Sequence, residues 1–163
     1  MINRLPLLLF LIVFSVVPEI RAQDRNAVYF ELGGSAIIPS FNYERRVNPR
    51  WTARAGFSVA VGYTEEDTDT TFVFPLTVSW LSHPERNHHF ETGGGLTLAA
   101  GDRQDLWEDS DDEEKFSNLF VTGIVGYRYQ KPAGGFQFRA VVTPVAGDGD
   151  ILPWAGLSFG YVW

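Results

Sequence analysis

The chain has 163 residues, a length that suits one domain, and it contains no cysteine, so no disulfide framework can hold it together. Twenty acidic side chains against thirteen lysines and arginines give a net charge of −7, which argues against nucleic acid as a partner because nucleic-acid binding depends on a basic surface.

The first segment has the plan of a secretory signal peptide. Arg4 precedes an apolar run from Leu7 to Val17, and a short segment ending at Ala22 follows. That run is too short to cross a bilayer, which takes about 20 apolar residues. We therefore expect residues 1–22 to be a cleaved signal peptide and residues 23–163 to form the exported domain. An uncleaved membrane anchor is the alternative.

The remainder of the chain alternates between two kinds of side chain, which is the period-2 pattern of β-strands. From Trp51 to Tyr63, aromatic residues, valines and alanines alternate with small or polar residues. Most of the segments that show this pattern are near the length of about 9–11 residues that a tilted transmembrane strand needs. We predict eight strands, near residues 27–34, 36–46, 51–63, 71–82, 88–100, 117–130, 135–145 and 153–163.

The connections between these strands alternate in length. Residues 47–50, 83–87 and 131–134 are short turns that contain proline, whereas residues 64–70, 101–116 and 146–151 are longer and acidic. Short turns at one end and long loops at the other are typical of outer-membrane barrels. The sequence therefore predicts an all-β fold, a closed eight-stranded antiparallel transmembrane β-barrel.

The two faces of the predicted strands differ in a way that favours a membrane over a soluble barrel. The bulky face is apolar and nearly free of charge, as expected for contact with lipid, and aromatic residues fall near the strand ends, as in membrane girdles. The opposite face carries the charges. These are Glu31, Glu44, Arg46, Arg54, Glu91, Arg128 and Arg139. We expect the domain in the outer membrane of a diderm bacterium, with outer-membrane lipid as its surroundings. A secreted soluble ligand-binding β-barrel is the alternative.

The last strand ends in alternating large residues followed by a terminal aromatic residue. Together with the signal peptide and the eight strands, this pattern resembles the small OmpA/OmpX-like outer-membrane barrels; Phe41–Arg45 and Gly126–Gln130 look like segments of small barrels of this kind. The resemblance implies that the outer-membrane barrel assembly machinery is a partner and reads the last strand. The matching residues are Leu157, Phe159, Tyr161 and Trp163.

Charged side chains inside a narrow barrel must be paired, because an unpaired buried charge is costly. We therefore interpret the seven inner charges as a structural ion network that fills the lumen. A gated, narrow ion path through rearranged pairs is the alternative. A barrel of eight strands leaves room for side chains and no open aqueous channel.

The longest predicted loop is strongly acidic. Carboxylates at this density could bind a divalent cation weakly, although the spacing does not fit an EF-hand, and a solvated loop is the default interpretation. The candidate ligands are Asp109, Asp111, Asp112, Glu113 and Glu114.

Three histidines, His83, His88 and His89, surround one short turn, with Ser82 and Glu91 nearby in the sequence. Some eight-stranded barrels modify lipid A with a serine, a histidine and an acid, but those residues sit near the outer rim. Here they fall at the opposite end, and no nucleophile motif is present.

We expect a non-enzymatic barrel without a cofactor, with a structural or surface-interaction role through its acidic extracellular loops. A lipid A acyl hydrolase or acyltransferase is the enzymatic alternative.

Overall fold

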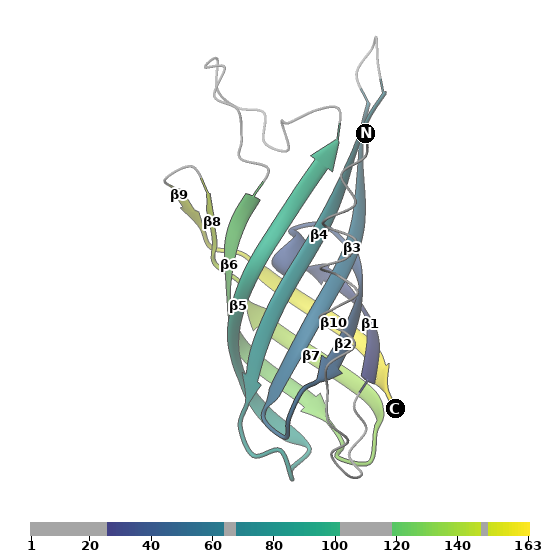
Figure 1. Cartoon of the computed structure of the whole chain (residues 1–163), viewed down its shortest axis with the longest axis vertical. Coiled ribbons are helices and arrows are strands. Elements are labelled where there is room, and N and C mark those ends of the chain that lie inside the picture. Colours follow the sequence, from purple (N-terminus) through teal and green to yellow (C-terminus); the bar gives the residue numbers. More distant parts are fainter. Residues whose placement is uncertain (1–25, 64–67, 102–118, 148–149) are drawn as a thin grey trace.

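The computed structural model describes residues 26–63, 68–101, 119–147 and 150–163 as one antiparallel barrel (Figure 1). The long strands are β3 (Trp51–Tyr63), β4 (Thr68–Leu81), β5 (His88–Gly101) and β6 (Leu119–Gln130). The others are β1 (Asn26–Gly33), β2 (Ser40–Arg46), β7 (Gly135–Val142), β8 (Val145–Gly147), β9 (Asp150–Leu152) and β10 (Ala155–Val162). A 3₁₀ turn, η1 (Gly34–Ala36), follows β1.

The sheet closes on itself through eight strands. The strands β1 to β7 pair in sequence order, and β10 pairs with both β7 and β1. Asn26 and Trp163 complete this seam, because each backbone N–H donates to the other residue's carbonyl oxygen, at 3.0 and 2.9 Å. The predicted all-β fold and closed eight-stranded barrel are confirmed.

The two remaining strands extend the last hairpin beyond two prolines. Pro144 and Pro153, which lack an N–H, separate β7 from β8 and β9 from β10. The pairing resumes past the break, since Thr143 N–H donates to the Trp154 carbonyl and β8 pairs with β6 and β9. Strands β7 and β10 lie within the last two predicted strands, whereas β8 and β9 lie mostly within residues 146–151, which the sequence predicted as a loop.

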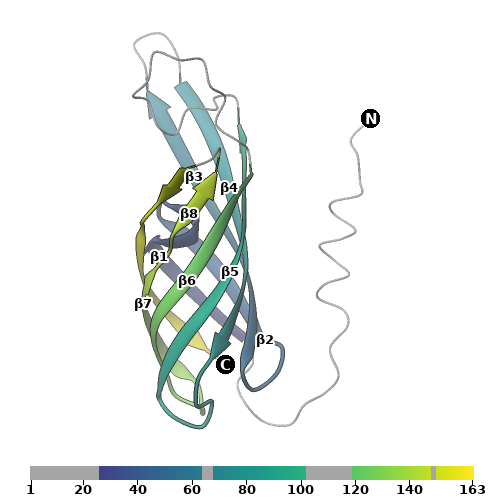
Figure 2. The same ribbon diagram turned by 90° about the vertical axis from the view of Figure 1, so that its left-hand side faces the viewer.

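The strands are inclined to the long axis of the barrel (Figures 1 and 2). The pairing of strands around the barrel is staggered, with the same β3–β4 register on both sides of Gly56 and Phe57. One circuit of the barrel from partner to partner leads from Tyr129 on β6 back to Leu119, ten positions earlier on the same strand. A register shift of this kind requires the strands to tilt by roughly 35–45° from the barrel axis. In a barrel of eight strands, the lumen is narrow enough for side chains to fill it.

Aromatic residues pair across strands at the end with the short turns. Trp51 lies opposite Trp80, Phe90 opposite Tyr127, and Phe136 opposite Tyr161. The turn before β3 is held by Asn48, whose side-chain oxygen accepts hydrogen bonds from the N–H groups of Arg50 and Trp51, each at 2.9 Å. Asn26 and Trp163, the residue pair that begins the seam between β1 and β10, lie at this same end of the barrel.

The first connection differs from our expectation of a strand over residues 36–46. Strand β2 begins only at Ser40, and the chain between Gly33 and Pro39 turns into the barrel, where Ser35 and Ala36 are buried. As a result, β1 and β2 have 8 and 7 residues, whereas β3, β4 and β5 have 13 or 14 and rise well beyond them (Figure 1). The wall of the barrel is therefore lowest at β1 and β2.

Within the described residues, no helix is both long enough and apolar enough to span a membrane.

Candidate functional site

The candidate site is a connected set of charged and polar side chains in the lumen. It is built on inward positions of the strands, where alternation sends every second side chain into the barrel. Three glutamates and three arginines form its ionic part, so the formal charges of these six side chains cancel. They are Glu31, Glu44, Arg54, Glu91, Arg128 and Arg139, all at most 5% exposed.

Glu91 on β5 is the first centre of the network. Arg128 on β6 binds it with two nitrogens, Nε and Nη2, both at 2.9 Å. Arg139 on β7 binds the same two carboxylate oxygens at 3.0 and 2.9 Å. Arg128 and Arg139 are directly opposite each other in the β6–β7 ladder, so Glu91 screens two like charges that would otherwise repel. Arg128 also binds Glu44 on β2, with Nη2 and Oε2 at 2.8 Å.

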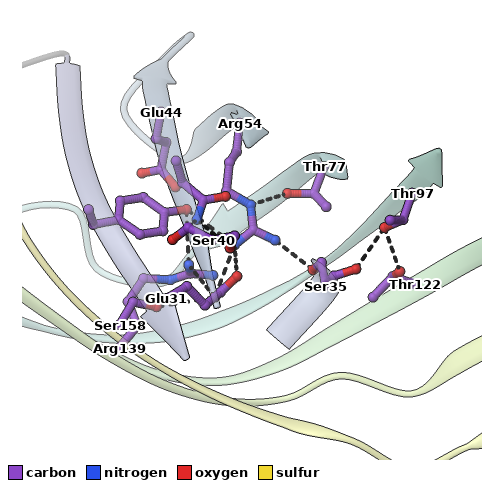
Figure 3. A network of polar contacts seen from close by, with 12 residues as sticks. Glu31, Ser35, Ser40, Glu44, Arg54, Thr77, Thr97, Thr122, Arg139 and Ser158 are labelled. Atoms are coloured by element: carbon purple, nitrogen blue, oxygen red, sulfur yellow. Dashed lines mark hydrogen bonds and ion pairs between the residues drawn. The ribbon is translucent and has the colours of Figure 1, made fainter. Parts of the chain in front are cut away.

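Glu31 on β1 is the second centre (Figure 3). Its carboxylate accepts hydrogen bonds from Arg54 on β3 at 3.2 Å, from Arg139 at 3.3 Å and from the hydroxyl of Ser158 on β10 at 3.1 Å. The Tyr29 hydroxyl joins the two arginines, because it accepts from Arg54 at 3.2 Å and from Arg139 at 3.0 Å. The two centres are therefore one network.

The network continues from Arg54 to the loop end of the lumen (Figure 3). Arg54 Nε donates to the Thr77 hydroxyl on β4 at 2.7 Å, and Nη2 donates to the Ser35 hydroxyl at 2.6 Å. The Thr97 hydroxyl on β5 donates to the Ser35 carbonyl at 2.7 Å. With these contacts, every wall strand of the closed barrel contributes a side chain, and the inward-turned segment is bound to the network.

Above the polar network, the loop end of the lumen is apolar. Ile37 from the inward-turned segment packs with the buried side chains of Phe120 and Val145 and with the partly buried Ala99 and Trp154. The Trp154 ring N–H donates to the Ile37 carbonyl at 3.1 Å. Ile37 adopts φ 71°, a left-handed conformation that is strained for a β-branched residue. Surrounding contacts therefore hold the segment inside the barrel.

The architecture matches that of a barrel of known structure. No family model matches the chain, and no curated protein matches it in sequence. The N-terminal β-barrel domain of Pseudomonas aeruginosa OprF is similar in structure, with a TM-score of 0.60 and 12% sequence identity. The match covers 88% of this chain and 100% of that domain.

The fold is that of an OmpA-like barrel. At this level of identity the similarity establishes the fold alone.

All seven charged residues predicted for the inner face are buried. Six of the seven lie in the network described above. The seventh, Arg46, is buried at the end of β2 near a short turn. The residues of the predicted assembly signal lie on the opposite surface: Leu157, Phe159, Tyr161 and Trp163 are all exposed on the outside of β10 or directly after it.

The histidine cluster does not form a catalytic arrangement. His89 is buried, and its ring nitrogens contact the backbone carbonyl oxygens of Ser82 and Gln130, at 2.8 and 3.2 Å. The Ser82 hydroxyl accepts a hydrogen bond from the Phe90 N–H, and Glu91 is bound by the two arginines. His89 thus connects the ends of β4, β5 and β6, and among the described residues neither a serine hydroxyl nor a carboxylate is bound to its ring.

The acidic loop with its candidate metal ligands Asp109, Asp111, Asp112, Glu113 and Glu114 lies outside the described residues, as does the predicted signal peptide. Within the described part of the chain, no group of three or more histidines and carboxylates could hold a metal ion.

Sequence reasoning missed two parts of this site. Tyr29, Ser35, Thr77 and Ser158 complete the network as uncharged members that the sequence did not single out. Alternation puts Thr77 and Ser158 on the inner face, and it could have placed Tyr29 there beside Glu31. It also missed the apolar inner residues at the loop end, because Phe120 and Val145 have the composition of the lipid-facing side. The Gly33-Gly34 pair and Pro39 were the only local signal of an irregular first connection.

Proposed function

We propose that this protein is an outer-membrane β-barrel with a closed lumen and no enzymatic activity. The observation that carries the proposal is the inversion of its two faces. Arg128, Arg139, Glu31 and Glu91 are at most 1% exposed, whereas Leu157, Phe159, Val125 and Val142 on the outside are 46–56% exposed. Water would favour the opposite arrangement, and hydrocarbon favours this one. The same inversion argues against the secreted soluble barrel.

The network supports the proposal of a closed lumen. An ion crossing the barrel would have to displace bidentate arginine–carboxylate pairs, and each separated charge would lose its partners in a low-dielectric interior. The apolar cluster around Ile37 forms a second barrier. These features support a structural barrel over a narrow ion channel. Any interaction of the protein at the cell surface would then be made by its loops.

We also propose that the acidic loops meet the partners of the protein at the cell surface, including divalent cations that bridge them to anionic lipid headgroups. The net charge of −7 and the concentration of carboxylates in residues 101–116 support this role. The outer-membrane barrel assembly machinery is the partner expected for the exposed last strand.

The first test is heat-modifiability. Membrane fractions of cells that express the full chain are separated on SDS gels with and without boiling. A folded membrane barrel migrates faster unboiled and is found in the outer-membrane fraction. A soluble protein whose migration boiling does not change would contradict the proposal.

The second test is conductance in planar lipid bilayers. The purified, heat-modifiable protein should leave the bilayer silent. Regular single-channel steps that disappear on Ile37→Trp substitution would instead support a channel through the lumen.

An assay with radiolabelled lipid A addresses the enzymatic alternative. Activity that is lost on His89→Ala would support a lipid A acyl hydrolase or acyltransferase.

A further inference from the structure

The outer surface of the barrel is hollowed across β6, β7, β10 and β1. The groove has a volume of about 550 Å³. All of its lining residues are apolar or glycine. The side chains on the outer surface are Leu32, Val125, Ala140, Val142, Ala155 and Leu157.

Two features of the chain produce this groove. Ala140 and Ala155 are small, while their neighbours Val142 and Leu157 are larger and stand out from the wall, at 56% and 46% exposed. In addition, the wall ends early on one side. After Gly33 the chain turns inward, so that no residue of β1 lies beside Ala155 on the outside.

The position of Gly34 shows how far inward the chain turns. A Cβ atom added to Gly156 would point into the barrel and come within 2.7 Å of the Gly34 Cα. Gly34 therefore lies directly behind the wall at Gly156. A straight continuation of β1 would have covered the outer surface above Leu32. Because the chain after Gly33 enters the lumen instead, that part of the outer surface stays hollow.

The groove lies at membrane depth. Val142 is six residues along β7 from Phe136, which belongs to the aromatic pairs at the short-turn end. With a rise of roughly 3.3 Å per residue and a tilt of about 40°, Val142 stands about 15 Å above that level. The apolar band of an outer-membrane barrel is about 25 Å tall, so the groove falls within its upper half.

We propose that this groove is a binding site for one acyl chain of a bilayer lipid. The inference rests on the proposed membrane location. No charged or polar side chain lines the groove, so a polar ligand would lose its hydrogen bonds to water without replacement. A hydrocarbon chain loses none, and it restores the dispersion contacts that a hollow lacks. The groove is also continuous with the exposed apolar surface around it, which would already contact lipid.

The experiment reconstitutes the full chain into vesicles of dioleoyl phosphatidylethanolamine and dioleoyl phosphatidylglycerol, extracts it with mild detergent and counts bound phospholipid by native mass spectrometry. Ala140→Phe fills the groove. Ala55→Phe is the matched control, because Ala55 is a similarly half-buried outward alanine on β3, away from the groove. Ala155→Phe is a second groove-filling variant in case Ala140→Phe does not fold.

We expect the wild type and Ala55→Phe to retain one phospholipid, and the groove-filling variants to lose it by roughly tenfold in the bound fraction. Equal retention by all variants, or a wild type that retains none, would overturn the proposal. So would a dimer that only the groove-filling variants lose, since a second copy would then be the occupant. Heat-modifiability is measured first on each sample. A heat-modifiable protein without bound lipid refutes this inference alone, whereas a protein that never inserts refutes the proposed function.

Discussion

Glu91 and Arg128 form a bidentate ion pair inside the barrel, with both nitrogen–oxygen distances at 2.9 Å. Arg139 binds the same two carboxylate oxygens. One carboxylate is thus shared by two arginines that the β6–β7 register places directly opposite each other, and Glu44 and Glu31 each pair with one of them as well. The stability of this part of the lumen should depend on the charge of Glu91 more than on that of any exposed carboxylate.

Replacing Glu91 by glutamine should therefore destabilise the barrel strongly. The shape of the side chain is kept, but Arg128 and Arg139 are left as adjacent buried charges, and breaking a buried pair in this way costs about 3–5 kcal/mol. The measurement is urea-induced unfolding in lipid vesicles, followed by the gel shift between folded and unfolded forms.

The control for this variant is Glu85→Gln, which removes the same charge from an exposed turn. It should change the free energy of unfolding by less than about 0.5 kcal/mol. If the two glutamines had equal effects, the network would not be the source of stability that the geometry indicates.

An arginine on the lipid-facing surface should be costly in proportion to its depth. Leu76 lies on the outside of β4, in the middle of the strand, and Leu76→Arg should cost about 2–4 kcal/mol in vesicles because hydrocarbon would surround the new charge. Val47→Arg, in an exposed short turn, should cost about 0–1 kcal/mol. The same urea titration measures both. Equal costs at the two positions would mean that Leu76 does not contact hydrocarbon.

The faces of the strands could be predicted from the sequence because alternation is a local property. Ser158 must point inward if Leu157 and Phe159 point outward, and the structure agrees along β10. The network pairs could not be predicted, because Arg54 and Glu31 come together only through the register of β1, β2 and β3. That register is set by backbone hydrogen bonds between separate strands, which the alternation within one strand does not reveal.

The inward turn after β1 was unpredictable for a related reason. The segment from Gly34 to Pro39 is short, and nothing in its composition determines whether it faces solvent or the lumen. Its position depends on Arg54, Thr97 and Trp154, which hydrogen-bond to Ser35 and Ile37 from three other strands or connections. Local patterns predicted an irregular connection at most.

This segment offers a test of its own. Gly34 has φ 69°, and an added Cβ would meet the Glu31 carboxylate. Gly34→Ala therefore combines backbone strain with displacement of a buried network member. We expect a loss of about 2–4 kcal/mol in the free energy of unfolding.

Gly135→Ala separates the two causes. Gly135 also has a positive φ, of 97°, but no atom lies within 4 Å of its added Cβ. It should show only the backbone cost of about 1–2 kcal/mol. If Gly34→Ala were no worse than Gly135→Ala, the segment would be free to move away from Glu31, and its contacts to the network would contribute little.

The last strand should matter for assembly more than for stability. The Trp163 backbone closes the barrel through its hydrogen bonds to Asn26, while its side chain is 48% exposed and outside the lumen. Trp163→Ala keeps those backbone bonds, so the variant should refold in vesicles with nearly the stability of the wild type. In cells, the fraction of heat-modifiable protein in the outer membrane should fall severalfold, because the assembly machinery would lose part of its recognition surface. Trp51→Ala, another exposed tryptophan of the short-turn end, is the control and should assemble normally. An equal loss for both variants in cells, or a matching loss of Trp163→Ala in purified vesicles, would assign the effect to membrane anchoring and not to recognition.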